Sequence, residues 1–287
     1  NIIITGSDGF IGNNLKKELS KYFNVIPMSR KKGYDMSMPI KINFKKKIDF
    51  FIHTAFQVKV DKLNISEYNK INYQGVLNSL NFCRTNNTKY IFLSSYVYGP
   101  PAYLPIDIYH PPNPHNDYSK IKLKCEKLCK QYSDKYNMSS IILRLFNIYG
   151  KKQRAGYIFS DIIKQIENNK IYVKNLNSKR DFLHVNDLTS LVRKIIINNF
   201  NEGKIFNVGS GKSTSINEIT EIFVKLKNNL KFLLAQINSQ EEIKKERWSK
   251  SNLIRDCYAN IKDLEDIYNW QPKISIEEGI KKLLNNE

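Results

Sequence analysis

Cysteine is scarce in this sequence, and its pattern predicts neither a disulfide framework nor a metal site. The 287-residue chain has four cysteines and no Cys-x-x-Cys pair: Cys83, Cys125, Cys129 and Cys257. Cys125 and Cys129 have helical i, i+4 spacing, but no histidine stands near them at a spacing typical of metal sites. The four histidines are scattered as well: His53, His110, His115 and His184. We therefore expect buried free thiols and no structural metal.

Long hydrophobic runs are also absent. The longest ones, such as Ile141–Leu145 and Ile195–Ile197, are far shorter than the roughly 20 apolar residues that span a bilayer. We expect no signal peptide, because the first residues already form a strand that leads into a glycine-rich turn. Together these absences predict a cytoplasmic protein without membrane insertion.

Acidic residues are outnumbered. The chain has 27 Asp and Glu against 46 Lys and Arg, so its formal net charge is +19. Such a charge favours anionic partners. However, the lysines are spread along the chain, the runs Lys45–Lys47 and Lys244–Lys245 are short, and nucleic-acid binding needs a basic patch interleaved with exposed aromatic residues. We expect no nucleic-acid partner.

The most informative stretch lies within the first twelve residues. The apolar run Ile2–Ile4 leads into three glycines spaced three apart, Gly6, Gly9 and Gly12, and a helical pattern follows. In a dinucleotide-binding turn one glycine permits the tight turn, the next lets a pyrophosphate approach the backbone, and the third lets helix pack on strand. The helix N-terminus offers free N–H groups to the phosphates. A tight strand-to-helix turn without a ligand would show the same pattern.

Strands and helices alternate through the first half of the chain. We expect strands over residues 25–30, 48–53, 90–94 and 140–146, and helices over 66–84 and 118–136. Strands that are apolar throughout and alternate with helices imply a parallel sheet covered on both faces. Right-handed crossovers then give a doubly wound Rossmann-type α/β fold.

After Gly150 the alternation loosens. Helices are predicted over residues 158–168, 187–197, 216–226 and 276–284, strands over 171–173 and 204–208, and irregular chain elsewhere. We interpret residues 1–150 as a dinucleotide-binding domain to which roughly 183–212 return. Residues 151–182 and 213–287 are expected to form a smaller C-terminal substrate-binding lobe.

Chemically useful side chains follow the strand ends, where such sheets bind ligands. Ser94 ends one strand, Asn147 follows the next, and Tyr118 and Lys122 stand four apart on one helical face. A cation ~4 Å from a phenol, at an effective dielectric of ~20, contributes about 4 kcal/mol, which lowers a phenol pKa by about 3 units. We therefore expect Lys122, with the charge of an oxidised nicotinamide, to make Tyr118 a proton shuttle, while Ser94 hydrogen-bonds the same substrate oxygen.

Further motifs extend along nearly the whole chain: His53-Thr54-Ala55, Asn72-Tyr73-x-Gly75, Ser94-Ser95-Tyr96-Val97-Tyr98-Gly99, Arg144-x-x-Asn147-x-Tyr149-Gly150, Arg180-Asp181-Phe182-x-His184-Val185-x-Asp187, Phe206-Asn207-Val208-Gly209 and Trp270-x-Pro272. With the glycine turn and Tyr118-x-x-x-Lys122, the chain resembles the extended short-chain dehydrogenases/reductases of the NAD-dependent epimerase/dehydratase family, whose members act on nucleotide sugars.

The resemblance implies a role for individual residues. Ser94, Tyr118 and Lys122 would be catalytic. The cofactor would contact Gly6, Gly9, Phe10, Ile11, Gly12, Ser29, Arg30, Asp35, Met36, Ala55 and Asn72, besides Tyr118 and Lys122. The substrate would contact Tyr96, Asn147, Arg180 and Arg255, with Asn147 at its diphosphate and the two arginines at its nucleotide. His184 is expected to pack or to cap a helix.

Two departures from the family narrow the chemistry. The second strand ends in Ser29-Arg30-Lys31, without the acidic residue that binds a ribose 2′-hydroxyl, and an arginine there suits a 2′-phosphate. We therefore favour NADP(H) over NAD(H); a merely solvated Arg30 would leave NAD(H) instead. The 4,6-dehydratases of the family carry Asp-Glu after the serine, where this chain has Ser95-Tyr96, so the acid–base pair of carboxylates is missing.

Three functions follow, the first favoured. In one, NADPH reduces an NDP-4-keto-6-deoxy sugar at C4 and Tyr118 protonates the oxygen. In the second, tightly held NAD oxidises C4 of an NDP-sugar and hydride returns to the other face, which gives a 4-epimerase. The third is a non-catalytic Rossmann protein that senses dinucleotide or binds RNA, although such relatives typically lose the tyrosine or the lysine that this chain keeps.

Two further expectations concern the surface. The loop Tyr109–His115 is expected to shape the sugar pocket or to anchor a lid. The family also implies a homodimer through the helices over 66–84 and 118–136. Leucines on these helices are the candidates for the interface: Leu77, Leu80, Leu123 and Leu128.

Overall fold

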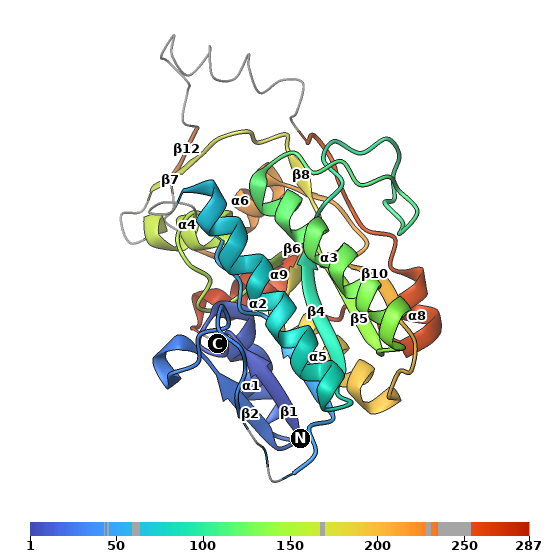
Figure 1. Ribbon diagram of the computed structural model, residues 1–287. Helices are drawn as coiled ribbons and strands as arrows, with labels where there is room; N and C mark the ends of the chain where they lie inside the picture. Colours follow the sequence, from blue (N-terminus) through green and yellow to red (C-terminus); the bar gives the residue numbers. More distant parts are fainter. Residues whose placement is uncertain are drawn as a thin grey trace.

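A six-stranded sheet runs through the molecule in the order β10-β5-β4-β3-β1-β2 (Figure 1). The computed structural model describes residues 1–42, 44, 46–58, 64–166, 170–227, 231–234 and 254–286. The six strands are β1 (Ile2–Thr5), β2 (Val25–Met28), β3 (Phe50–His53), β4 (Lys89–Ser95), β5 (Ser140–Leu145) and β10 (Lys204–Val208). All neighbours pair in parallel, so the carboxyl ends of the strands lie at one edge. The doubly wound α/β fold is confirmed.

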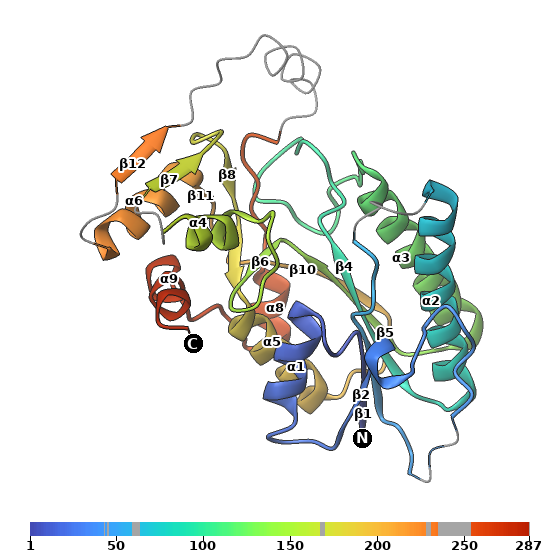
Figure 2. The same ribbon diagram turned by 90° about the vertical axis from the view of Figure 1, so that its left-hand side faces the viewer.

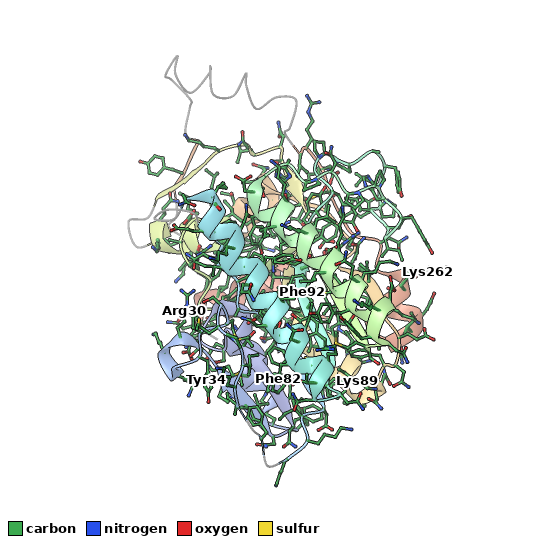
Figure 3. The ribbon with its side chains drawn as sticks, viewed as in Figure 1. Arg30, Tyr34, Phe82, Lys89, Phe92 and Lys262 are labelled. Atoms are coloured by element: carbon green, nitrogen blue, oxygen red, sulfur yellow. The ribbon has the colours of Figure 1, made fainter. Side chains whose placement is uncertain are left out.

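Helices cover both faces of this sheet (Figures 1 and 2). On one face α1 (Phe10–Leu19) packs against α5 (Val185–Asn198), and on the other α2 (Ile65–Thr85) packs against α3 (Asp117–Tyr136). Successive strand residues alternate between the two layers: Ile2 and Ile4 enter the core with α1 and α5, whereas Ile3 enters the core with α2 and α3. Phe92 of β4, near the centre of Figure 3, belongs to this second layer.

Smaller elements gather beyond the carboxyl ends of the strands (Figure 2). Three short strand pairs occur there: β6 (Asn147–Tyr149) with β9 (Phe182–His184), β7 (Lys170–Val173) with β12 (Lys231–Leu234), and β8 (Lys179–Arg180) with β11 (Thr214–Ser215). The helices of this part are α4 (Ile158–Ile166), α6 (Ile216–Leu226) and α9 (Ile276–Leu284). They enclose a separate apolar core that includes Phe159, Ile219 and Phe223.

The region after α6 differs from the prediction of irregular chain before the last helix. It contains β12 and a further helix, α8 (Lys262–Tyr268), which packs against α5. Among its seven residues α8 buries only Leu264 and Tyr268, so its helical period is too short to be recognised in the sequence. Five of the residues assigned above to helix 158–168 or to the lysine runs lie outside the described residues: Glu167, Asn168, Lys45, Lys244 and Lys245.

All four cysteines are buried and free, as predicted. Within the described ranges, no group of His, Cys, Asp or Glu is arranged to hold a metal ion, and every helix is too short or too polar to traverse a bilayer. Leu80 and Leu128 lie in the core, whereas Leu77 and Leu123 are half-buried. The homodimer stays a prediction.

Candidate active site

The turn between β1 and α1 excludes side chains at two of its glycines. Gly6 has a φ of +63°, and a Cβ there would lie 2.8 Å from the backbone of Ala55. A Cβ on Gly12 would lie 2.3 Å from the carbonyl oxygen of Gly6. Helix α1 begins after Gly9 without a side-chain cap and without an acidic residue in its first turn. The turn is therefore a bare backbone cradle that suits a pyrophosphate.

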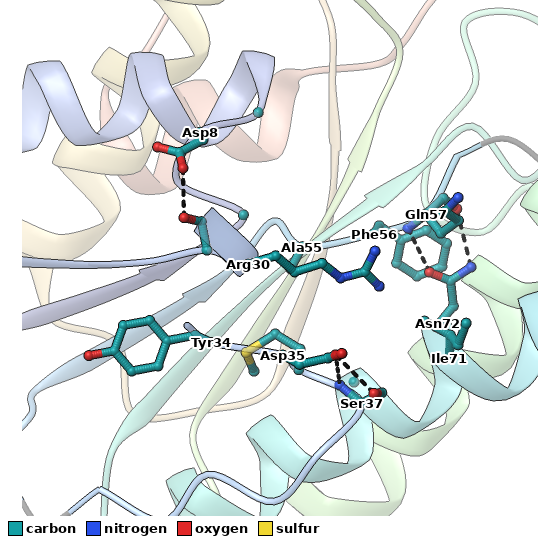
Figure 4. A pocket seen from close by; sticks show the side chains of 15 residues that line it. Asp8, Arg30, Tyr34, Asp35, Ser37, Ala55, Phe56, Gln57, Ile71 and Asn72 are labelled. Carbon is teal, nitrogen blue, oxygen red and sulfur yellow. Dashed lines mark hydrogen bonds between the residues drawn. The ribbon is translucent and has the colours of Figure 1, made fainter. Parts of the chain in front are cut away.

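A pocket of about 200 Å³ adjoins the glycine turn at the ends of β2 and β3 (Figure 4). Besides Gly6 and Gly9, six residues that were predicted to contact cofactor line it: Ser29, Arg30, Asp35, Met36, Ala55 and Asn72. Asn72 is buried and acts on the backbone of Gln57, whose N–H donates to Asn72 Oδ1 (2.8 Å) and whose carbonyl accepts from Nδ2 (3.1 Å). Asn72 thereby fixes the segment after β3.

Sequence reasoning missed an acidic group at the end of β2, because it comes from the glycine turn. Ser29 Oγ donates to Asp8 Oδ2 at 2.6 Å. This hydrogen bond, with the charges of Lys16, Lys31 and Lys32, holds the pKa of Asp8 below its usual value. Arg30 extends across the same pocket, between the Ala55–Phe56 segment and Asp35 (Figure 4). The pocket thus offers a carboxylate that suits a ribose hydroxyl and a guanidinium that suits a phosphate.

A second cavity, of about 870 Å³, continues from the glycine turn toward the smaller elements. It shares Gly6, Gly9 and Phe56 with the first pocket, so the two are parts of one channel. The predicted residues that it brings together are Phe10, Ile11, Ser94, Tyr96, Tyr118, Lys122, Asn147 and Arg180. Arg255 does not line it: that side chain is exposed, and its carbonyl accepts from the N–H of Lys179 (2.8 Å).

The start of α3 positions Tyr118 and Lys122. Asn116 and Ser119 form a capping box, in which Asn116 Oδ1 accepts from the N–H of Ser119 at 2.8 Å. Tyr118 therefore stands in the first helical turn and Lys122 one turn later. Lys122 Nζ donates to the carbonyl of Leu93 (2.6 Å) and lies 3.7 Å from the ring centroid of Phe56. Burial lowers the pKa of Lys122 to about 7.

In the polypeptide by itself, the pKa of Tyr118 is raised and not lowered. Burial raises the pKa of the Tyr118 phenol, and a hydrogen bond with Ser95 is the largest opposing effect. Lys122 Nζ lies 5.7 Å from the Tyr118 ring centroid, and its ammonium is turned toward the carbonyl of Leu93. Burial thus favours the protonated phenol of Tyr118, which suits a proton donor.

The structure places the two serines of β4 differently from the prediction. Ser94 Oγ donates to Glu126 Oε1 at 2.5 Å, inside the protein. The hydroxyl beside Tyr118 belongs to Ser95. Neighbouring residues of a strand point to opposite faces of the sheet, so an assignment that is off by one residue exchanges the roles of Ser94 and Ser95. The role of hydrogen-bonding the substrate oxygen, which was predicted for Ser94, is accordingly proposed below for Ser95.

The substrate side of the cavity is built by short strands and a loop. Asn147 Nδ2 donates to the carbonyl of Asp181 (3.1 Å), and Arg180 Nη1 donates to Ser178 Oγ (2.8 Å). Tyr96 OH donates to the carbonyl of Gly99 (2.5 Å). From the loop Tyr109–His115, His115 lines the cavity.

Two other histidines have structural roles. His184 Nδ1 accepts from the N–H of Asn186 (3.2 Å) and caps α5, as expected. His110 Nε2 accepts from the N–H of Ala102 (2.9 Å) and ties two parts of the Gly99–Pro114 loop together. Both side chains are buried.

The charged side chains that line the cavity are all cationic among the described residues. Four cationic side chains line it, Lys122, Lys152, Arg154 and Arg180, and none of the described residues that line it is an aspartate or glutamate. A wall of this kind favours an anionic ligand such as a diphosphate.

Comparison with known proteins agrees with this geometry. Residues 2–209 match the NAD dependent epimerase/dehydratase family. A putative UDP-glucose 4-epimerase of Methanocaldococcus jannaschii is 32% identical, with 99% of this chain and 97% of the relative covered. The GDP-6-deoxy-D-mannose reductase of Pseudomonas aeruginosa is 25% identical, with 99% and 96% covered.

Solved structures show the same fold. RMD from Pseudomonas aeruginosa, complexed with NADPH, superimposes with a TM-score of 0.83 at 24% identity and covers 99% of this chain and 97% of its own. MoeE5 in complex with UDP-glucose and NAD gives a TM-score of 0.84 at 20% identity, with 100% and 98% covered. The chain therefore belongs to the NAD-dependent epimerase/dehydratase family of NAD(P)-dependent enzymes that act on nucleotide sugars.

Proposed function

We propose that this enzyme is a 4-ketoreductase of an NDP-4-keto-6-deoxy sugar that uses NADPH. The observation that carries the proposal is the Tyr118 phenol beside Ser95 in a cationic cavity whose described lining has no carboxylate. When bound, the reduced nicotinamide supplies a hydride to C4 of the keto sugar. Tyr118 donates its proton to the C4 oxygen, and Ser95 hydrogen-bonds that oxygen. Together these steps convert the ketone to a hydroxyl.

The other residues bind and orient. Gly6, Gly9 and Gly12 would hold the cofactor pyrophosphate against the bare N-terminus of α1. Lys122 lines the cavity one helical turn after Tyr118, and its positive charge would favour the phenolate left after proton transfer. Asn147 and Arg180 line the far side of the cavity and would bind the substrate diphosphate and nucleotide.

A second candidate function is an NDP-sugar 4-epimerase that keeps its NAD bound. Asp8 favours it, because a carboxylate at the end of β2 accepts hydrogen bonds from a ribose and repels a 2′-phosphate. The putative 4-epimerase from Methanocaldococcus jannaschii supports it as well. Tyr118, Lys122 and Ser95 would have the same roles in either reaction.

The function is tested with purified protein and a panel of dTDP-, GDP- and UDP-linked 4-keto-6-deoxy sugars. A reductase consumes NADPH and forms the 6-deoxy sugar in equal amounts. An epimerase instead interconverts UDP-glucose and UDP-galactose without net change in nicotinamide, and releases NAD when denatured. Protein that binds neither cofactor, judged by calorimetry and by mass spectrometry, would contradict both functions.

Replacing Arg30 or Asp8 in the first pocket is expected to change cofactor preference. Arg30→Ala should weaken NADPH binding about tenfold, or about 1.4 kcal/mol, with NADH binding unchanged. Asp8→Asn should act in the opposite sense and strengthen NADPH relative to NADH, because it removes the anion beside Ser29. Isothermal titration calorimetry measures both affinities. Lys262→Ala is a control, since this exposed cation lies on α8, across the molecule from Arg30 (Figure 3). If Arg30→Ala and Lys262→Ala lost equal affinity for NADPH, the role of Arg30 would be refuted.

A further inference from the structure

A buried carboxylate lies directly behind the proposed catalytic residues. Tyr118, Lys122 and Glu126 follow each other at intervals of four on α3, so they share one face of that helix. The Glu126 side chain is only 3% exposed. A carboxylate at that depth needs partners inside the protein.

Two residues supply those partners. Ser94 Oγ donates to Glu126 Oε1 at 2.5 Å, and Arg144 donates through Nε to both carboxylate oxygens (3.2 and 3.1 Å) and through Nη2 to Oε2 (2.7 Å). The Arg144 side chain is 6% exposed. Burying two charges offsets most of their attraction, and apolar residues of similar volume often stabilise a core as well. Stability alone therefore does not explain an ion pair at this place.

The same network reaches the other strand ends. Arg144 Nη1 donates to Tyr98 OH (2.8 Å), Tyr98 OH donates to Asn207 Oδ1 (2.6 Å), and Asn207 Nδ2 donates to the carbonyl of Ile106 (2.9 Å). These bonds connect the ends of β4, β5 and β10 beneath the cavity. A displaced Glu126 would thus disturb the part of β4 that carries Ser94 and Ser95.

The negative charge of Glu126 also acts on the Lys122 ammonium. Desolvation lowers the pKa of Lys122 to about 7, and the charge of Glu126 opposes that decrease. The other titratable groups that interact with Lys122 are uncharged at neutral pH: burial raises the pKa of Cys125 to about 12 and that of Cys129 well above its usual value, and lowers the pKa of His53 to about 3. Arg144 is charged, and it shares the carboxylate.

We propose that Glu126 is a positioning residue for this reaction: it anchors Ser94, and with it the chain that presents Ser95, and it supplies the negative charge that faces Lys122 from behind. Arg144 limits how much of that charge Lys122 feels, because it binds the same carboxylate. The inference rests on the proposed function, in which the Lys122 cation assists Tyr118.

The test is the pH dependence of kcat/KM for two variants that should shift in opposite directions. Activity needs protonated Lys122, so it falls as pH rises through the pKa of Lys122. Glu126→Gln removes the negative charge, and the alkaline limb should move to lower pH by about one unit. Arg144→Gln leaves the carboxylate unshared, and the limb should move to higher pH. Because the two shifts are opposite, either variant is informative if the other fails to fold.

Two controls separate charge from packing. Glu126→Asp keeps the charge and should leave the limb within a few tenths of a pH unit, whereas Ser94→Ala removes one hydrogen bond and should lower kcat without moving the limb. A purely structural role predicts lower melting temperatures with the limb fixed in every folded variant, and that outcome would overturn the proposal.

A second readout needs no turnover. Carbon-13 NMR of ε-labelled lysine follows the titration of Lys122, with the signal assigned by its loss in Lys122→Met. The Lys122 pKa should fall in Glu126→Gln and rise in Arg144→Gln. If these shifts occur while no nucleotide sugar is turned over, the proposed function fails and the electrostatic role of Glu126 stands; unshifted signals contradict that role even in an active enzyme.

Discussion

Tyr118→Phe is expected to lower kcat about 10³-fold and to leave cofactor affinity within twofold of the native value. The substitution removes the proton donor, and general acid catalysis by a positioned side chain contributes typically 10²–10⁴-fold. The ring that packs edge-on against Phe56 stays, so the cavity keeps its shape. Steady-state kinetics with the keto sugar gives kcat, and calorimetry gives the affinity for NADPH.

Tyr157→Phe is the matched control for that variant. Tyr157 lines the same cavity, yet it precedes α4 and is not on the face of α3 that carries Lys122. Its loss of hydroxyl should change kcat less than tenfold. If Tyr157→Phe were as inactive as Tyr118→Phe, or if Tyr118→Phe kept more than a tenth of the activity, another group would be the proton donor.

Asp181→Ala is expected to have the largest effect on stability, about 4 kcal/mol, or roughly 10 °C in melting temperature. The buried Asp181 carboxylate accepts from the N–H and Oγ of Ser210 (2.5 and 2.7 Å), from the N–H of Gly211 (3.1 Å) and from the N–H of Ala259 (3.0 Å). Without it three N–H groups lose their acceptor, two of them half-buried and that of Ala259 fully buried. Each unpaired buried group costs about 1–3 kcal/mol.

Losing the Asp181 carboxylate should also displace residues on the substrate side of the cavity. Asp181 lies between Arg180 and Phe182, and its carboxylate holds the segment that contains Cys257. Thermal unfolding followed by circular dichroism measures the melting temperature. Asp181→Asn keeps one acceptor oxygen and should lie between the native protein and Asp181→Ala. Asp266→Asn, an exposed control on α8, should stay within about 1 °C; an Asp181→Ala protein as stable as this control would contradict the role.

Most of the fold was predictable from the sequence because its signals are local. The glycine turn spans only Gly6 to Gly12, and each strand of the sheet contains a short apolar run of its own. The helix predicted over 276–284 is observed with the same bounds, since its caps and apolar stripe lie within eleven residues. Strands of two or three residues, such as β8 and β9, carry no period and were missed.

The sequence was enough to predict most of the residues of the site, but not the directions and contacts of their side chains. Tyr118 and Lys122 were found because helical spacing fixes their relation. Ser94 and Ser95 could not be told apart, because the direction of each depends on the register of β4 with β5, which places Ser94 opposite Arg144. Asp8 was missed for the same physical reason: its contact with Ser29 joins residues 21 apart, and no local pattern encodes it.

The return of the chain to the sheet also has a consequence for its synthesis. Strand β5 ends at Leu145, the chain leaves for the smaller elements, and only Lys204–Val208 come back to pair with Ile141–Leu145. A fragment that stops near residue 150 would therefore leave a long apolar strand with open N–H and C=O groups along one side, which is a template for pairing with other chains. During translation the ribosome must deliver about sixty further residues before this edge closes, and the unfinished protein is expected to aggregate unless a chaperone shields it.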